Sequence, residues 1–122
     1  MFEEIYTAIN DPSKLHCRSD EEISELLVRY PALPEDYCKF LREVGFGNLG
    51  TLVIYDAPMR STEVYPVEVP LEGIVLFGDD MQGYCYGFDL MEGGRVVEID
   101  PRGEIDRTVQ ANFLDFIKAF LI

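Results

Sequence analysis

The spacing of apolar residues changes at Gly45, and this change restricts the folds that are open to the chain. Before Gly45, apolar residues recur at intervals of three and four, as on the buried face of a helix. Three segments carry this pattern, and they predict helices over residues 2–9, 19–30 and 34–44. Gly45 itself suits the C-terminal end of the third helix, where a left-handed backbone is common.

After Gly45 the pattern alternates as in β-strands, and turn-forming residues separate the segments. Strands are predicted over residues 51–55, 63–67, 74–77, 83–89 and 96–100, and a loop over residues 47–50. The connections are too short for parallel crossovers, so neighbouring strands should run antiparallel. The apolar run 74–77 does not alternate, which predicts a central strand covered on both faces. Pro66 favours a sheet edge for the second strand.

The last segment returns to helical spacing and completes the fold class. It predicts a helix over residues 113–121 with Asn112 as its N-cap, and Ser19 with Glu22 predicts a capping box at the second N-terminal helix. We therefore expect an α+β fold, a mainly antiparallel sheet of about five to six strands with N-terminal helices and a C-terminal helix packed on it. With 122 residues and no linker or repeat, residues 1–122 should form a single domain.

Acidic residues dominate the charge: 10 Lys and Arg stand against 23 Asp and Glu, a formal net charge of −13. Phosphate backbones are bound by Lys and Arg that displace counterions, so this balance argues against nucleic acid as a ligand. Anionic membrane surfaces are disfavoured for the same reason. Hydrophobic residues make up 48% of the chain, which supports a folded core rather than disorder.

The use of cysteine and histidine argues against a structural metal site. Cys17, Cys38 and Cys85 form no C-x-x-C pair, and His16 is the single histidine. We expect all three thiols to be buried as small apolar groups. No segment has the composition of a signal peptide or the length of a membrane span, which favours a reduced, cytoplasmic protein. No cofactor is predicted.

Two motifs that could carry chemistry have plainer explanations. The G-x-G-x-x-G spacing over residues 45–50 follows a helix and precedes a strand, the reverse of a dinucleotide site. A group of carboxylates could hold Mg²⁺ or Ca²⁺ through oxygen ligands; its members are Asp79, Asp80, Asp89 and Asp100. Aspartate and glycine here also suit tight strand connections, and the alternating ligands of a calcium loop are missing. We predict neither a metal site nor catalytic residues.

No Lys or Arg lies between Arg60 and Arg95, although seven Asp and Glu and three Tyr fall there. Two interpretations stay open. The carboxylates can form a solvated acidic surface, or they can form a docking surface for a basic protein, with tyrosines as apolar anchors. For the second interpretation, the candidate partner-binding residues are Glu68, Glu72, Asp79, Asp80, Tyr84 and Tyr86.

Three segments between residue 33 and the end of the chain resemble motifs of the SUKH superfamily. Residues 33–47, LPEDYCKFLREVGFG, are similar to its LP-x-x-Y-x-x-F-L … N-G helix. Residues 77–89, FGDDMQGYCYGFD, are similar to its central F-G-x-D-G-x-G … Y-x-F-D hairpin, and residues 111–117, ANFLDFI, to its A-x-S-F-x-x-F-L closing helix. Val44 stands where Asn is frequent, Asp80 replaces the hairpin glycine, and the tryptophan common in relatives is absent.

The resemblance implies an α+β domain and non-enzymatic work through protein–protein binding. The family includes fungal regulators of cell-wall synthesis and small bacterial immunity proteins that neutralise toxins. A single domain of this length resembles the immunity type, and its partner would be a basic, nuclease-type toxin domain. A regulatory or scaffold module with an endogenous partner is the alternative. A metal-dependent enzyme using Asp79, Asp80 and Asp89 is the third hypothesis.

Overall fold

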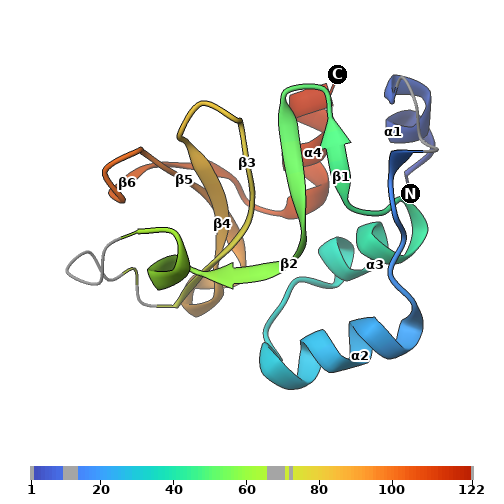
Figure 1. Cartoon of the computed structure of the whole chain (residues 1–122), viewed down its shortest axis with the longest axis horizontal. Coiled ribbons are helices and arrows are strands. Elements are labelled where there is room, and N and C mark those ends of the chain that lie inside the picture. The colour runs from blue at the N-terminus through green and yellow to red at the C-terminus, as the bar shows by residue number, and fades with distance from the viewer. Residues whose placement is uncertain (1, 10–13, 66–70, 72, 122) are drawn as a thin grey trace.

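The computed structural model describes residues 2–9, 14–65, 71 and 73–121. Within these ranges the elements follow one another as Figure 1 shows. The helices are α1 (Glu3–Ala8), α2 (Asp20–Arg29), α3 (Glu35–Glu43) and α4 (Phe113–Leu121). The strands are β1 (Gly47–Leu49), β2 (Leu52–Arg60), β3 (Ile74–Asp79), β4 (Cys85–Asp89), β5 (Arg95–Ile99) and β6 (Ile105–Gln110). Short 3-10 helices, η2 (Ser61–Glu63) and η3 (Leu90–Glu92), follow β2 and β4.

The six strands form one sheet in which each strand pairs with its neighbour in the chain. The order is β1-β2-β3-β4-β5-β6, and every pair is antiparallel. The short connections explain this, because a parallel neighbour would need a long crossover. The predicted α+β fold, with its antiparallel sheet and helices at both ends of the chain, is confirmed. In the described ranges, no helix is long and apolar enough to cross a membrane.

The sheet is covered on both faces, with the larger core on the side of the helices. In β3, Val75 and Phe77 belong to the core shared with the helices, whereas Ile74 and Leu76 belong to a second apolar cluster. Successive side chains of a strand point to opposite faces, so the two clusters lie on opposite sides of the sheet. Tyr65, which follows η2, is part of the second cluster. The prediction that β3 is buried on both faces is therefore confirmed.

Aromatic rings join the helices to the sheet in the larger core. Phe77 of β3 stacks on Phe88 of β4, with ring centroids 4.5 Å apart. Phe113, at the start of α4, meets the Phe77 ring edge-on at 5.3 Å. Tyr37 of α3 lies 4.9 Å from Phe88 and 5.3 Å from Phe113. Because all four rings are fully buried, these contacts fix α3 and α4 on one face of the sheet.

Both predicted N-caps, one at α2 and one at α4, are present. The Ser19 hydroxyl accepts a hydrogen bond from the Glu22 amide at 3.2 Å, and the Glu22 carboxylate accepts one from the Ser19 amide at 3.0 Å. At α4, the side-chain oxygen of Asn112 accepts a hydrogen bond from the Asp115 amide at 2.9 Å. These bonds satisfy amides that have no partner within the first turn of a helix.

Two strands of the sheet are missing from the sequence prediction. Residues 47–49 form β1 although a loop is predicted there, because the glycine-containing segment still pairs with β2. β6 is not predicted at all, and its residues Ile105, Asp106 and Thr108 are exposed. An edge strand that is open to water needs no apolar alternation, so the period that reveals the inner strands is lost there.

The predicted strand over residues 63–67 is wrong for its described part. Glu63 ends η2, and its carboxylate accepts a hydrogen bond from the Arg60 amide at 2.7 Å. Residues 66 and 67 lie outside the described residues. The bond from Arg60 to Glu63 closes a turn immediately after β2, which itself runs five residues further than predicted, to Arg60.

Candidate binding surface

Of the six residues predicted to bind a partner, the four that the structure describes do not form one surface. Asp79, Asp80 and Tyr84 come together around the turn between β3 and β4, where each is partly exposed. Glu68 and Glu72 lie outside the described residues. The structure therefore places half of the predicted set at one turn.

Tyr86 belongs to the core, which corrects its prediction as an anchor for a partner. It is 6% exposed, and its ring packs against Phe116 at 4.9 Å and Phe120 at 6.0 Å, both on α4. Side chains alternate along β4, and Tyr86 shares with Phe88 the face that meets the helices. The alternation is visible in the sequence, but the face that each set occupies depends on where the helices pack.

The carboxylates at the β3–β4 turn hold the turn in place. Asp79 Oδ1 accepts a hydrogen bond from the Met81 amide at 2.8 Å. Asp80 Oδ1 accepts two, from the Gln82 amide at 2.8 Å and from the Tyr84 amide at 3.2 Å. Met81 is exposed and has a left-handed backbone with a φ of 63°. Hydrogen bonds from nearby amides to aspartate stabilise such turns. The structure therefore directly supports the explanation that these aspartates serve the tight connection between strands.

A second aspartate turn, between β5 and β6, lies beside the first. Asp100 Oδ1 accepts hydrogen bonds from the Arg102 amide at 2.9 Å and the Glu104 amide at 3.0 Å. The Arg102 guanidinium pairs with Asp100 at 3.2 Å and with Glu104 at 3.4 Å. Pro101 faces Gly83 of the first turn, where a Cβ would lie 3.1 Å from the proline ring. The two turns are thus in contact.

We call residues 79–84 and 100–104 the turn surface. It contains four carboxylates and one arginine. Most of the carboxylate oxygens already accept hydrogen bonds or ion pairs from within the two turns. The turn surface is acidic, but most of its carboxylate oxygens already bond to groups of the two turns and so stabilise the turns themselves.

The contacts of Asp100 make folding stability depend on pH at acid values. Hydrogen bonds from the Glu104 and Arg102 amides and the Arg102 guanidinium hold the pKa of Asp100 below its usual 3.8. A carboxyl group with a lower pKa in the folded chain stabilises the fold above its unfolded pKa. That contribution disappears as the pH falls through the folded pKa.

We therefore expect Asp100→Asn to destabilise the protein at neutral pH and the difference from wild type to shrink below about pH 4. Urea unfolding at a series of pH values measures this difference. Asp106→Asn, at an exposed position of β6, is the control and should leave the curve unchanged. A gap between wild type and Asp100→Asn that is the same at every pH would contradict the assignment.

The carboxylates of the metal hypothesis do not come together. In the β3–β4 ladder Asp79 pairs with Cys85 and Asp89 pairs with Ile74, so Asp79 and Asp89 lie at opposite ends of the hairpin. Asp79, Asp80 and Asp89 therefore cannot share one ion. No other group of three His, Cys, Asp or Glu side chains in the described part of the chain is arranged to hold a metal.

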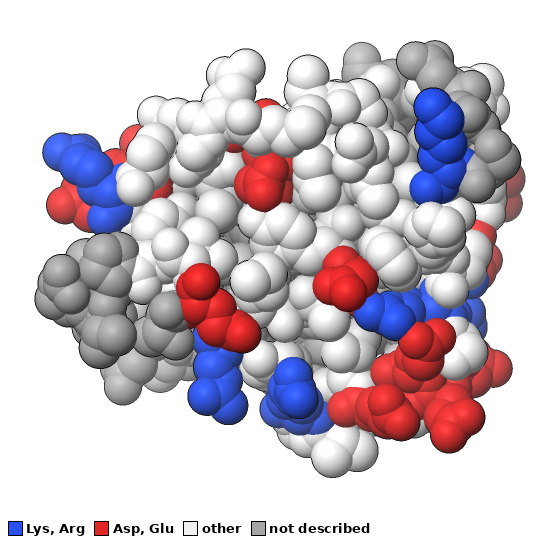
Figure 2. Space-filling view, in the orientation of Figure 1, with Lys and Arg blue, Asp and Glu red and all other residues white. Residues whose placement is uncertain are grey.

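The carboxylates of α2 form a surface that the sequence analysis does not single out. Figure 2 shows a dense group of acidic side chains at the lower right, over the beginning of α2 in Figure 1. We call this group the α2 surface; its members are Asp20, Glu21, Glu22 and Glu25 of α2 and Asp56 of β2. Carboxylates are expected in the first turn of any helix, where they complement the helix dipole. The sequence pattern therefore gives no reason to single out these carboxylates as a surface.

Arg18 joins α2 to β2 beneath this surface. Its guanidinium donates hydrogen bonds to the Asp56 carbonyl oxygen at 2.6 and 2.8 Å and to the Glu22 carboxylate at 2.5 Å. It also lies 4.9 Å above the centre of the Phe46 ring. Ile23 is the one fully buried residue of α2, and Val28 on the opposite side is 83% exposed. Arg18 is therefore a main tether of a helix that faces solvent over most of its surface.

Ion pairs neutralise much of the small basic complement of the chain. Among the described residues, ion pairs to carboxylates are made by five of the ten Lys and Arg of the chain; they are Arg18, Lys39, Arg42, Arg95 and Arg102. With 23 Asp and Glu in the chain, many carboxylates have no cation to compensate them. The molecule therefore presents a negative potential to an approaching partner.

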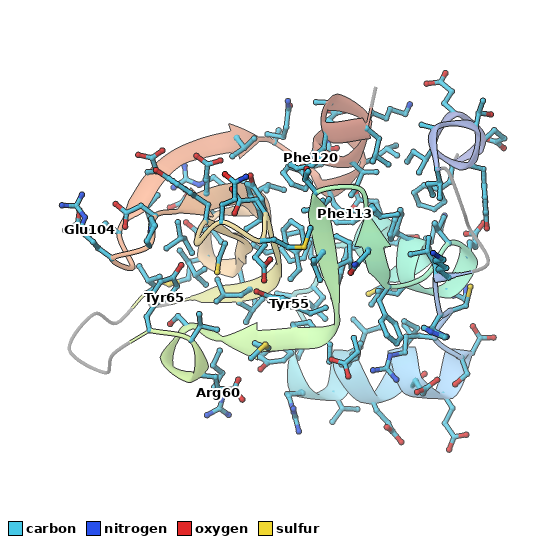
Figure 3. All side chains as sticks on the ribbon, turned by 45° about the horizontal axis from the view of Figure 1, so that its top comes forward. Tyr55, Arg60, Tyr65, Glu104, Phe113 and Phe120 are labelled. Carbon is cyan, nitrogen blue, oxygen red and sulfur yellow. The ribbon has the colours of Figure 1, made fainter. Side chains whose placement is uncertain are left out.

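Tyr55 connects the turn surface to the second apolar cluster. Its hydroxyl donates a hydrogen bond to Asp79 Oδ2 at 2.7 Å and lies 3.9 Å from Cys85 Sγ. Tyr65 packs in the same cluster (Figure 3). Burial raises the pKa of both tyrosines, so both hydroxyls stay protonated at neutral pH. With Met81 on one oxygen and Tyr55 on the other, the Asp79 carboxylate is engaged on both sides.

The three cysteines differ in exposure. Cys38 and Cys85 are buried, as predicted. Cys17 is exposed, so the prediction of burial is wrong for this residue. It lies in the segment before α2, where its neighbour His16 forms an isolated bridge with Phe46 and the Cys17 side chain faces solvent.

Comparison of the sequence with protein-family models gives no match, and comparison with curated proteins gives none either. The resemblance to the SUKH superfamily therefore rests on the three segments quoted above. The function has to be argued from those segments, the fold and the surface.

Proposed function

We propose that the protein is a cytoplasmic immunity protein of SUKH type, a non-enzymatic domain that binds and neutralises a basic, nuclease-type toxin domain. The observation that carries the proposal is the excess of exposed carboxylates over unpaired basic groups. A toxin that acts on nucleic acid needs a basic cleft to hold phosphates, and an acidic surface complements such a cleft. The α+β fold and the three sequence segments support the same class of protein.

The α2 surface is the better docking site of the two acidic surfaces. Glu21 and Glu25 are exposed, and neither side chain makes a hydrogen bond or ion pair with the described residues. Asp79 and Asp100, in contrast, already use both carboxylate oxygens in hydrogen bonds within the protein. A carboxylate without an internal partner can meet a cation of the toxin at no cost to the fold. Val28 beside these glutamates adds exposed apolar area for the contact.

The turn surface supplies a smaller second contact in this proposal. Asp80 keeps Oδ2 available, because both of its amide bonds go to Oδ1. Tyr84 is partly exposed beside it and offers an aromatic face. Tyr86 belongs to the core, and Asp79 is engaged at the turn. Of the described residues of the predicted site, Asp80 and Tyr84 therefore remain available to a partner.

Co-expression with the product of the adjacent gene tests the proposal. We expect a stable complex and protection of the host from the toxicity of that product. Combining Glu21→Lys with Glu25→Lys should slow association by about tenfold or more at low ionic strength, and salt should reduce the difference. Stopped-flow or surface-based kinetics at two salt concentrations measure the effect.

The matched control combines Glu4→Lys with Glu92→Lys, which changes the net charge equally at exposed positions outside both surfaces. Equal slowing by the control pair would remove the α2 surface from the proposal. No complex and no protection would overturn the immunity function. Stable capture of a housekeeping protein instead would favour a regulatory or scaffold module.

A further inference from the structure

Met81, in the turn between β3 and β4, has a backbone conformation that its side chain disfavours. Among the described residues it is the only one other than glycine with a positive φ, 63°. A side chain makes this left-handed region unfavourable, and residues held there are concentrated at binding and active sites. Carboxylates fix the backbone on both sides, because Asp79 Oδ1 accepts a hydrogen bond from the Met81 amide and Asp80 Oδ1 accepts one from the Gln82 amide, each at 2.8 Å.

The Met81 side chain contributes little packing to the fold. It is 55% exposed, and it belongs to neither of the two apolar clusters that cover the sheet. Single exposed apolar side chains are common on protein surfaces, but Met81 combines its exposure with an unfavourable backbone. The fold alone therefore gives no reason for a methionine at this position. A contact with another molecule would provide one.

Two further side chains extend the apolar area around Met81. Tyr84 ends the same turn and is partly exposed, and Pro101 of the second turn is exposed and lies against Gly83. The aspartate hydrogen bonds hold both turns, so these side chains are in position before a partner arrives. A rigid anchor loses little conformational entropy on binding, and methionine and tyrosine are both enriched in protein interfaces.

The charges beside this apolar area indicate the chemistry of the partner. Asp80 Oδ2 accepts no hydrogen bond from the described residues, and Glu104 is exposed in the second turn. The charge of Arg102 is balanced by Asp100 and Glu104. An apolar centre with an acidic rim complements an apolar pocket with a basic rim. Clefts that bind nucleic acid have this chemistry, because they combine basic groups for the phosphates with aromatic side chains on which bases stack.

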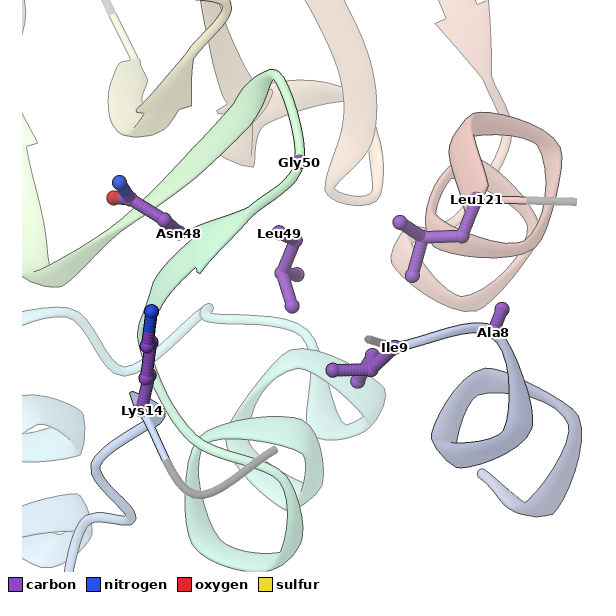
Figure 4. A pocket seen from close by; sticks show the side chains of 7 residues that line it. All are labelled: Ala8, Ile9, Lys14, Asn48, Leu49, Gly50 and Leu121. Carbon is purple, nitrogen blue, oxygen red and sulfur yellow. The ribbon is translucent and has the colours of Figure 1, made fainter. Parts of the chain in front are cut away.

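The exposure of Met81 shows on which molecule the pocket has to lie. Figure 4 shows a hollow elsewhere in the chain, a cavity of about 290 Å³ between α1, β1 and the end of α4. The apolar side chains that line it, Ile9, Leu49 and Leu121, are partly or fully buried within the chain. Met81, in contrast, is exposed at a turn. The hollow that receives its side chain therefore belongs to the partner.

We propose that Met81 is the apolar anchor of the turn surface and that it inserts into a base-stacking pocket of the toxin domain. The thioether of methionine packs favourably against aromatic rings, which are the lining of such a pocket. Tyr84 and Pro101 then contact the mouth of the pocket, and Asp80 meets a basic group at its rim. This inference rests on the proposed function, and it specifies the pocket that the second contact occupies.

Met81→Gly separates the two properties of this residue. Glycine adopts the left-handed backbone without strain, so the unfolding temperature should rise by about 2 to 4 °C. The same variant lacks the anchor, so its complex with the toxin domain should dissociate about tenfold faster, with an almost unchanged association rate. Thermal unfolding followed by circular dichroism measures the first effect, and surface-based kinetics with the product of the adjacent gene measure the second.

Met91→Gly is the matched control, because it makes the same change at another exposed methionine. Met91 is 71% exposed, has no left-handed backbone and follows β4 at the other end of the hairpin. We expect it to leave dissociation unchanged and to lower the unfolding temperature slightly.

Three results would contradict the proposal, and they are distinguishable. A complex that Met81→Gly leaves as slow to dissociate as wild type would overturn the anchor but not the immunity function. An unfolding temperature that falls as far in Met81→Gly as in Met91→Gly would overturn the strain at Met81. Absence of any complex with the wild-type chain would overturn the proposed function and this inference together.

Discussion

Replacing Gly78 with alanine is expected to destabilise the protein by about 3 kcal/mol. Gly78 lies in β3 and pairs with Ile54 of β2 on one side and Tyr86 of β4 on the other. A Cβ at this position would lie 2.3 Å from the Val53 carbonyl oxygen, far inside the contact distance. The obstructing atom is backbone, so the clash is relieved only if β2 and β3 move apart and their hydrogen bonds weaken.

Gly93→Ala is the matched control for this substitution. Gly93 has a φ of 73°, and a Cβ there would meet no atom within 4 Å, so we expect a cost of about 1 kcal/mol from the left-handed backbone alone. Denaturant unfolding followed by circular dichroism compares the two variants in a chain that has no tryptophan to report by fluorescence. Equal destabilisation would contradict the close approach of β2 to β3 at Gly78.

Phe77→Ala is expected to remove about 4 kcal/mol of stability. The Phe77 ring is fully buried and stacks on Phe88 at 4.5 Å. Its edge contacts reach Phe113 at 5.3 Å and Phe116 at 5.4 Å, both on α4. Removing the ring leaves a cavity between the sheet and α4 that rigid neighbours cannot fill, so the loss exceeds the transfer free energy of the ring.

The control for this prediction is Phe120→Ala, which deletes the same type of side chain near the C-terminal end of α4. Phe120 is partly exposed and contacts only Tyr86 and Phe116 among the described aromatic rings. We expect about half the loss of Phe77→Ala, because part of the ring already faces water. Free energies of unfolding measured in guanidinium chloride compare the two variants. A larger loss for Phe120→Ala would place the centre of the core elsewhere.

The aspartates of the hairpins show why the binding residues are harder to predict than the fold. Asp79, Asp80, Asp89 and Asp100 carry the right chemistry for a docking surface, a metal site or a set of turns. Each of them accepts at least one hydrogen bond from a backbone amide at or near the end of its strand. Residue type alone cannot separate these roles, because the same oxygen serves any of them. Only the hydrogen-bond distances in the structure show that these carboxylates stabilise the turns.

The elements themselves follow closely from local pattern. The capping box at Ser19, the N-cap at Asn112 and the apolar run of β3 are each set by residues within a few positions of one another. β1 and β6 escape prediction, because an edge strand with one open side needs less apolar character than a strand between two others. Where the signals for a helix or strand lie within a few residues of one another, the sequence is sufficient to predict that element.

The α2 surface illustrates the opposite case. Its members lie on α2 and, thirty residues away, on β2, and Arg18 brings them together by bonding to both elements. In the sequence, the acidic residues at the start of α2 are fully explained by helix capping and the helix dipole. Their accumulation into a surface depends on how α2 sits against β2, which no local pattern records.

By itself the sequence determined the fold class, the antiparallel order and most of the helices and strands of this protein, because period, caps and short connections act locally. The tertiary structure decided which face of β4 meets the helices, and so assigned Tyr86 to the core that the sheet shares with them. It also decided which carboxylates remain available to a partner, Glu21 and Glu25 rather than Asp79. Both decisions rest on contacts between residues far apart in the chain, and such contacts exist only once the helices have packed against the sheet.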